Sequence, residues 1–145
     1  MSIFLRILIA MVLLAASSFK LMDLPGFVLV LRSYRFLPLE ILWPAGVAIT
    51  ASELLVGLWL LSGRQLVRAS LASASLHSIY AGWAAFMLLR GKPILNCGCF
   101  GSYLARPLSW STVLENLVLM ALSLALYASC QRRAEQGKVQ SGEGI

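Results

Sequence analysis

Two of the three cysteines lie one residue apart, in the stretch Asn96-Cys97-Gly98-Cys99-Phe100-Gly101. The Cα atoms of a Cys-x-Cys pair lie about 5.5–7 Å apart, which is at the upper edge of disulfide reach. Gly98 permits backbone dihedrals that a Cβ would forbid. A strained, exposed disulfide has a higher reduction potential than a relaxed one and passes its oxidation to another thiol pair. The stretch therefore predicts thiol–disulfide exchange at Cys97 and Cys99, with a loop staple or two packed thiols as the alternative.

Charged residues close to this pair would tune its reactivity. Lys92 and Arg106 flank the two cysteines, and a nearby positive charge lowers the pKa of a thiol. Cys130 lies a full apolar segment away and is interpreted as a bystander thiol. Three cysteines are too few for a disulfide scaffold or a closed zinc site. Two thiolates could still hold a soft ion such as Cu(I) or Hg(II), although no ladder of Met or Cys residues would pass it onward.

Three further polar residues, Glu53, His77 and Asn116, interrupt apolar segments. If the segments around the Gly63-Arg64 turn are helical, Glu53 and His77 differ in depth by about 3 Å and could pair. One interpretation is a hydrogen-bonded clamp between helices. The other is a proton relay or one edge of a quinone pocket, since thiol oxidation releases protons. Asn116 is expected to bond a neighbouring helix, with a ligand contact as the alternative.

The composition indicates a membrane protein. Of 145 residues, 59% are hydrophobic and 12% are charged, and the mean hydropathy is +0.82. An average soluble domain has about 25% charged residues, roughly twice as many. The net charge of +6 comes from basic residues scattered singly between apolar segments, without the aromatic-interleaved stripe of a nucleic-acid site. Membrane-flanking positive charge explains these residues better, and no nucleic-acid partner is expected.

The pattern of segments predicts an all-α membrane protein, a bundle of four transmembrane helices. The spans are expected at about residues 3–20, 39–61, 66–89 and 109–130, followed by a polar and disordered tail at 131–145. Between the first two spans, apolar residues recur at helical spacing with arginines on another side. This pattern predicts an interfacial amphipathic helix within residues 23–38.

Several local features refine the spans. The first could be a signal peptide, but a retained helix is favoured, with Lys20 snorkelling to the interface at its end. The third is rich in small residues, which allow helices to approach closely in lipid. Thr112 and Glu115 have the spacing of a capping box at the start of the fourth.

Four spans place both termini and the Arg64 turn on one side of the membrane, and the cysteine loop on the other. The basic residues divide evenly between the two sides. Arg132-Arg133 directly after a span is typical of a cytoplasmic flank. A Cys-x-Cys disulfide persists only in an oxidising compartment. We therefore expect cytoplasmic termini, with the cysteine loop in the periplasm or at the outer surface.

An ordered series of short motifs resembles the MauE branch of the MauE/DoxX membrane proteins, up to about Tyr127. The sharpest motif is Cys97-Gly98-Cys99-Phe100-Gly101 following Arg90-Gly91, and the others are Phe19-Lys20-Leu21 with Asp23, Tyr34-Arg35-Phe36-Leu37-Pro38, Glu53 with Gly57, and Trp110 with Asn116. The resemblance implies a four-helix inner-membrane protein. It also implies a role in maturing the disulfide-rich small subunit of periplasmic methylamine dehydrogenase, alongside a thioredoxin-like partner.

Motifs and resemblance together lead to one hypothesis. Cys97 and Cys99 would cycle between dithiol and disulfide at the periplasmic face, so that the protein would act as a thiol–disulfide oxidoreductase. A membrane quinone is the natural electron acceptor for such a bundle, although no motif specifies one. The competing hypotheses are a soft-metal handling protein and a membrane assembly factor without chemistry of its own.

Overall fold

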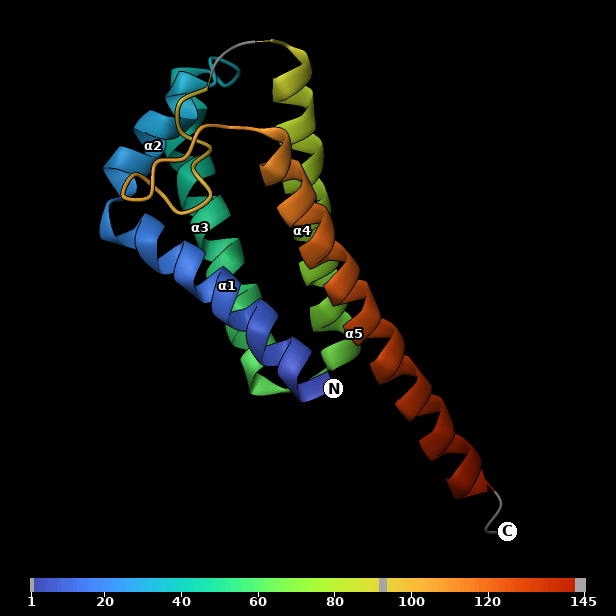
Figure 1. Cartoon of the computed structure of the whole chain (residues 1–145). Helices are drawn as coiled ribbons and strands as arrows, with labels where there is room; N and C mark the ends of the chain where they lie inside the picture. Colours follow the sequence, from blue (N-terminus) through green and yellow to red (C-terminus); the bar gives the residue numbers. More distant parts are fainter. Residues whose placement is uncertain (1, 92–93, 143–145) are drawn as a thin grey trace.

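The computed structural model describes residues 2–91 and 94–142, and within these ranges it contains five helices and no strand. The helices are α1 (Ser2–Met22), α2 (Leu24–Ser33), α3 (Leu39–Ser62), α4 (Leu66–Leu89) and α5 (Trp110–Gly142). α1 packs mainly on α3, and α4 packs mainly on α5, so the molecule consists of two helix pairs (Figure 1). The prediction of an all-α protein is confirmed.

Three of the helices are long and apolar enough to cross a bilayer: α1 from Ile3, α3, and α5 as far as Gln136. Their outward faces carry large apolar side chains such as Ile3, Leu55 and Leu114, each more than 60% exposed. Exposed apolar surface of this extent is what lipid contact requires. The protein is therefore a multi-pass membrane protein.

α4 is as long as α3 but is not among these three helices. Its serines, His77 and Arg68 lower its apolar character, while its buried face consists largely of Ala and Ser. These small residues bring α4 against α5, where the hydroxyls of Ser73 and Ser123 lie 3.0 Å apart. Close packing through small residues is the behaviour that the sequence predicted for this segment.

α2 is the short helix expected between the first two spans. Asp23 caps its N-terminus by accepting a hydrogen bond from the Gly26 amide at 2.9 Å. Phe27 and Val28 are buried, so one face of α2 packs inward, chiefly on α3. The cap and the packed face explain why a helix of only ten residues is stable here.

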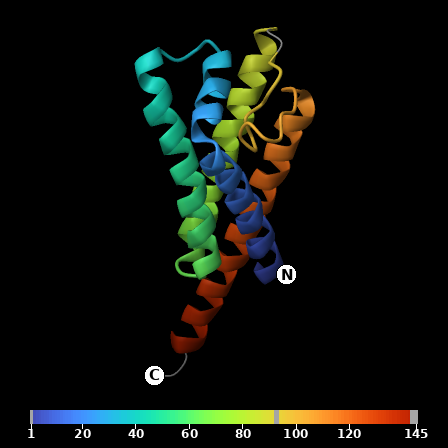
Figure 2. The same cartoon turned by 90° about the vertical axis from the view of Figure 1, so that its left-hand side faces the viewer.

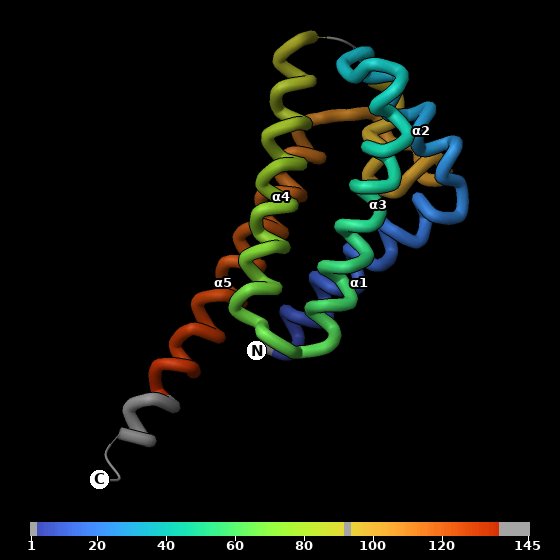
Figure 3. The backbone as a smooth tube through the Cα atoms, turned by 180° about the vertical axis from the view of Figure 1, so that it is seen from behind, coloured from blue at the N-terminus to red at the C-terminus, as the bar shows by residue number. Residues whose placement is uncertain are grey.

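Different elements form the two ends of the bundle. The N-terminal end of α1, the α3–α4 turn and the C-terminal half of α5 lie at one end, whereas α2 and the cysteine loop lie at the other (Figure 2). α5 continues well past the α3–α4 turn (Figure 3). The sequence analysis expected this span to end near residue 130 and a tail without regular structure to follow. The structure differs there, because α5 adds further helical turns beyond the bundle.

A compact apolar cluster closes the end near the α3–α4 turn. It is formed by Ile9, Ala10, Leu13, Leu60, Ala69 and Leu126, and Cys130 packs against it. Cys130 therefore lies at the opposite end of the bundle from Cys97 and Cys99, as expected. A smaller apolar cluster of Tyr34, Met87 and Ile94 lies toward the other end, where the cysteine loop also lines the cavity described below.

Candidate functional site

The cysteine pair lies on the loop between α4 and α5, which folds back into the bundle. Two backbone hydrogen bonds join its ends: the Leu108 amide donates to the Ile94 carbonyl at 2.9 Å, and the Cys97 amide donates to the Arg106 carbonyl at 2.8 Å. Ile94 is also buried against Met87 of α4. The loop is therefore held at its base rather than hanging free in solvent.

The turn that carries the cysteines depends on Asn96 and Gly98. The Asn96 side-chain oxygen accepts from the Gly98 amide at 2.9 Å, which is an Asx turn. Gly98 has a φ of +70°, and a Cβ there would lie 3.1 Å from Val30 and 3.2 Å from Phe27 of α2. Glycine thus provides both the left-handed conformation and the close approach to α2.

Contacts with α1 and α2 hold the rest of the loop. The Ser102 hydroxyl donates to the second carboxylate oxygen of Asp23 at 2.5 Å. Gly101 lies so close to α1 that an added Cβ would be 3.1 Å from the Phe19 carbonyl oxygen. The Tyr34 hydroxyl donates to the Cys97 carbonyl at 2.7 Å. Burial, and then the nearby cysteines, raise the pKa of Tyr34, so its hydroxyl remains a proton donor.

The two sulfurs are adjacent and electrostatically unequal. Both cysteines are free and half-buried, and their Sγ atoms lie 2.9 Å apart. The hydrogen bond from the Cys99 thiol lowers the pKa of Cys97 to about 6, and a bond from the Cys99 amide at 3.4 Å acts in the same direction. The pKa of Cys99 is raised, because Cys97 is its partner and because it is buried. The pair therefore holds its single negative charge on Cys97.

Arg106 supports this charge from the loop surface. Its guanidinium lowers the pKa of Cys97, by less than Cys99 does, and the Glu115 carboxylate acts to raise that pKa. Arg106 is held by Glu115, whose two carboxylate oxygens each lie 2.8 Å from Nη2. Glu115 therefore does not form the capping box predicted with Thr112. Lys92, the other predicted positive charge, lies outside the described residues.

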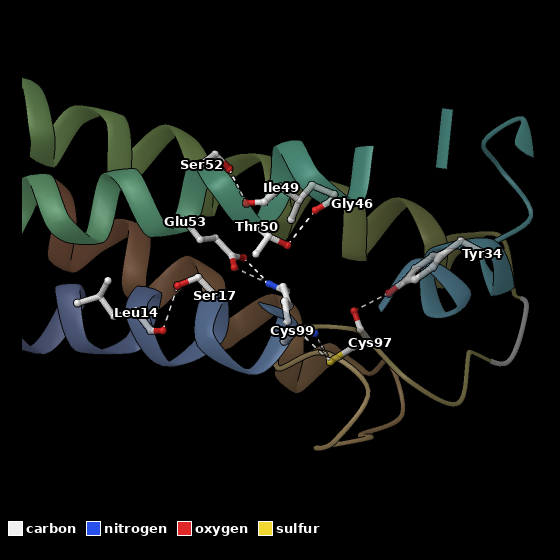
Figure 4. Close-up of polar contacts among 11 residues, drawn as sticks. Leu14, Ser17, Tyr34, Gly46, Ile49, Thr50, Ser52, Glu53, Cys97 and Cys99 are labelled. Atoms are coloured by element: carbon white, nitrogen blue, oxygen red, sulfur yellow. Dashed lines mark hydrogen bonds and ion pairs between the residues drawn. The ribbon is translucent and has the colours of Figure 1, made fainter. Parts of the chain in front are cut away.

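A buried ion pair lies deeper in the bundle, behind the sulfurs. The Lys20 ammonium contacts both oxygens of Glu53, at 2.5 and 2.7 Å, and both residues are 2% exposed. Figure 4 shows the Glu53 side chain with dashed lines from its two oxygens. Lys20 is close enough to Cys99 to favour its thiolate form. The prediction that Lys20 snorkels to the interface is wrong, because its side chain turns inward to Glu53.

His77 and Asn116 make other contacts than those predicted. The His77 Nδ1 atom lies 2.8 Å from the Ser73 carbonyl, so this nitrogen carries the proton, and the predicted pairing with Glu53 does not occur. The Asn116 amide donates to the Thr112 carbonyl at 2.9 Å, within α5 rather than across to another helix. Both side chains nevertheless face the same space as Glu53.

That space is a cavity of about 690 Å³ between the helix pairs and under the cysteine loop. It brings together side chains that are far apart in the sequence. Of the predicted site residues that the structure describes, all but Arg106 line the cavity: Glu53, His77, Cys97, Gly98, Cys99 and Asn116. Lys20 and Tyr80 line it as well. Most of the remaining lining is apolar. The arrangement places the sulfur pair against a largely apolar space.

The sequence analysis assigned no site role to Tyr34 or Tyr80. It assigned Thr112 to a capping box and not to the cavity lining. Their positions carried weak signals. Tyr34 belongs to the predicted amphipathic helix, and Tyr80 lies one helical turn after His77 on the same face. Neither signal distinguishes a site residue from ordinary packing.

Comparison with known proteins identifies the family of this chain. The family model described as methylamine utilisation protein MauE matches residues 1–129. A methylamine utilization protein MauE of Paracoccus denitrificans is 37% identical over 122 residues, covering 84% of this chain and 66% of the relative. One from Paracoccus versutus is 31% identical over 124 residues, covering 86% and 67%.

The chain thus spans about two thirds of the length of these relatives. No solved structure matches it. The family match extends from the start of α1 into the second half of α5, and so includes the residues that build the cavity and the cysteine loop. The chain belongs to the MauE family of methylamine utilisation proteins.

Proposed function

We propose that the protein is a membrane thiol–disulfide redox protein in which Cys97 and Cys99 alternate between a dithiol and a disulfide. The observation that carries this proposal is the 2.9 Å separation of the two sulfurs together with the opposite shifts of their pKa values. A disulfide bond measures about 2.05 Å, so only a small movement closes the ring. A staple would need neither a depressed thiol pKa nor a cavity beside it.

The unequal sulfurs take different roles in exchange. A thiol of lower pKa is the better leaving group. A thiolate of a reduced partner therefore attacks Cys99 of the disulfide and releases Cys97 as a thiolate. The partner's second thiol then attacks the mixed disulfide, which frees Cys99 and leaves the partner oxidised. Two electrons have then passed to the Cys97–Cys99 pair, and one S–S bond has been exchanged for another.

Four membrane crossings, with α4 as the third, are part of this proposal. α2 then lies at the interface, both termini are cytoplasmic, and the cysteine loop faces the periplasm. The placement of both termini on one side is supported by the common end that the α1 N-terminus, the α3–α4 turn and the distal part of α5 share. It also gives the cysteine pair the oxidising compartment that a disulfide needs.

The partner we propose is a periplasmic thioredoxin-like protein, and the client is a disulfide-containing protein such as a methylamine dehydrogenase subunit. Family membership supports the link to methylamine utilisation. The exposed side chains of Tyr103 and Leu104 on the cysteine loop provide apolar surface beside the sulfurs that a protein partner could cover. Docking on such a loop would bring a partner thiol to Cys99.

Trapping of mixed disulfides tests the proposal. In membranes of the native host, Cys97→Ser and Cys99→Ser are each introduced into a Cys130→Ser background, which removes the only other thiol. Cys97→Ser, which keeps the attacked sulfur of Cys99, is expected to accumulate an adduct with one thioredoxin-fold protein, visible on non-reducing gels and identified by mass spectrometry, whereas Cys99→Ser should accumulate less. The double variant Cys97→Ser/Cys99→Ser serves as the control and should form none.

The same variants separate the competing functions. Absence of any adduct, with loss of thermal stability alone, would mean that the pair is a staple. Stoichiometric binding of Cu(I) that either substitution abolishes would indicate the soft-metal function instead. In the described part of the chain, no cluster of three or more His, Cys, Asp or Glu residues is placed to hold a metal ion.

A further inference from the structure

Resting on the proposed redox role, we propose that the cavity beside the cysteine pair binds a quinone, which accepts the two electrons of the Cys97–Cys99 dithiol. A cycle that oxidises a client leaves this pair reduced, so an acceptor must restore the disulfide. The structure places a largely apolar cavity directly against both sulfurs. An acceptor reaching them from within the bundle must therefore be an apolar molecule that dissolves in lipid.

The size of the cavity suits such a ligand. Sites for small molecules and cofactors measure about 300–1,000 Å³ and are mostly apolar, with a few placed polar groups. This cavity has a volume of about 690 Å³. All the long helices and the cysteine loop contribute to its walls, and the apolar contacts include Leu31, Ile49, Trp83, Leu108 and Leu119. A quinone ring with its isoprenoid tail matches both the volume and the apolar walls.

Two buried hydroxyls in the lining indicate where polar atoms of a ligand would bind. The hydroxyl oxygens of Tyr80 and Thr112 are buried and have no hydrogen-bond partner within residues 2–91 and 94–142. Glu53 and Ser52 lie near the Tyr80 hydroxyl, but neither lies in hydrogen-bonding geometry with it. A buried polar group without a partner is destabilising, so a ligand that accepts its hydrogen bond is favoured there. A quinone offers two carbonyl oxygens, each able to accept one such hydroxyl.

The buried ion pair has no net charge, but it places the ammonium group of Lys20 beside the proposed ligand. Lys20 and Glu53 both line the cavity, and the Lys20 ammonium lies 5.9 Å from the centre of the Tyr80 ring. A positive charge in this low-dielectric space stabilises the negative charge that develops on the quinone oxygens as electrons arrive. We assign Lys20 as a positioning and electrostatic residue, held in place by Glu53.

The reaction balances without another oxidant. The two thiols lose two protons and two electrons, and one S–S bond forms between Cys97 and Cys99. The quinone gains both electrons, and each of its oxygens gains one proton, so that it leaves as the quinol. An acyl chain of a membrane lipid would also fit an apolar cavity, but it has no group that would bond the two hydroxyls.

Binding is tested separately from chemistry. The purified Cys97→Ser/Cys99→Ser chain is titrated in detergent with ubiquinone-1 and menaquinone-1, and binding is followed by quenching of tryptophan fluorescence, since Trp83 lines the cavity. Tyr80→Phe and Thr112→Val remove one hydroxyl each at nearly constant volume. Each is expected to weaken binding about 3–10-fold, the loss of one hydrogen bond, without lowering thermal stability. Tyr127→Phe, outside the cavity, is the matched control and should bind as the parent does.

Turnover is tested on the reduced Cys130→Ser chain under anaerobic conditions. Loss of quinone absorbance is expected to match the loss of two thiols per quinone. Ala84→Phe fills part of the cavity and should slow this reaction at least tenfold. Gly82→Leu is the control, because Gly82 of α4 is exposed and an added Cβ has no neighbour within 4 Å among the described residues, so this variant should react at the parent's rate.

The outcomes distinguish the two proposals. Quinone binding that is absent, or unchanged in Tyr80→Phe and Thr112→Val, overturns the quinone site, even if the cysteines still trap a thioredoxin-fold partner. Quinone reduction that is equally fast in Ala84→Phe overturns it as well. If the cysteines trap no partner while quinone is reduced as expected, the exchange function fails and the quinone site stands.

Discussion

Replacing Cys99 by alanine is expected to move the titration of Cys97 from about pH 6 to above pH 8. The main cause of the low pKa of Cys97, about 6 against an ordinary 9.0, is the hydrogen bond from the Cys99 thiol 2.9 Å away. A pKa of about 6 leaves roughly 90% of Cys97 as thiolate at pH 7, whereas a pKa near 9 leaves about 1%. Arg106 makes a smaller contribution, which the alanine variant retains.

The assay follows the pH dependence of alkylation at Cys97. The full chain with Cys130→Ser is reduced in detergent and pulsed with iodoacetamide between about pH 5 and pH 9, and modification is quantified by mass spectrometry. The midpoint is the quantity to compare. Absolute rates are misleading, because a thiolate of lower pKa is also a weaker nucleophile and part of the change cancels.

Two further variants identify the cause. Cys99→Ser keeps a hydroxyl donor near the Cys97 sulfur, so its midpoint should lie below that of Cys99→Ala. Arg106→Gln removes the positive charge and should raise the midpoint less than Cys99→Ala does. A Cys97 midpoint that stays near pH 6 in Cys99→Ala, or one that lies above pH 8 before any substitution, would refute the unequal roles assigned to the two sulfurs.

Three other predictions concern the structure that supports the site, measured by thermal unfolding of the full chain in detergent. Lys20→Met or Glu53→Leu alone should lower the free energy of unfolding by about 3 kcal/mol, because each leaves a buried charge unpaired. The free energy of unfolding of the double variant should be within about 1 kcal/mol of that of the parent. Gly98→Ala should lower the melting temperature and slow disulfide closure, since its φ is +70° and an added Cβ lies 3.1 Å from α2. Asp23→Ala should lower the melting temperature and expose the cysteine loop to protease, because the carboxylate caps α2 and accepts from Ser102.

Each of these predictions has its own control. Gly91 has a φ of +67°, and a Cβ added there would lie within 4 Å of no other described side chain or backbone segment. Gly91→Ala therefore introduces backbone strain without a close contact, and it should lower the melting temperature less than Gly98→Ala does. Equal losses would mean that the approach to α2 is unimportant. For the ion pair, additive losses in the double variant would contradict the pairing of Lys20 with Glu53. For Asp23, unchanged proteolysis of the loop would show that Ser102 is held by other contacts.

The pairing of Glu53 illustrates where sequence reasoning reached its limit. A carboxylate inside an apolar segment needs a partner, and this expectation holds. The predicted partner was His77, chosen from depth along two consecutive segments. α3 packs more extensively on α1 than on α4, so the partner came from α1 instead. Distance from a turn gives depth in a helix pair, but the rotation of each helix about its axis depends on packing.

Asn116 and Lys20 show the same limit. The amide of Asn116 was expected to reach another helix, yet it bonds the carbonyl one turn earlier in its own. Lys20 lies near a helix end, a position typical of an interfacial lysine. Its counter-ion Glu53 lies 33 residues later in the chain, so the local pattern did not indicate the pairing. A pattern of polar residues along one segment does not reveal which of them meet.

By itself, the sequence determined the features that depend on composition and covalent spacing. Apolar runs and breaker residues specify the helices, the low share of charged residues specifies the membrane, and Gly98 between Cys97 and Cys99 allows two sulfurs to meet in one turn. Only the tertiary structure decided that the loop folds back onto α1 and α2, that Lys20 pairs with Glu53, and that two hydroxyls without partners line a cavity beside the sulfurs. Those outcomes depend on how helices rotate and pack against one another, which is an energetic balance over many distant contacts rather than a property of any single segment.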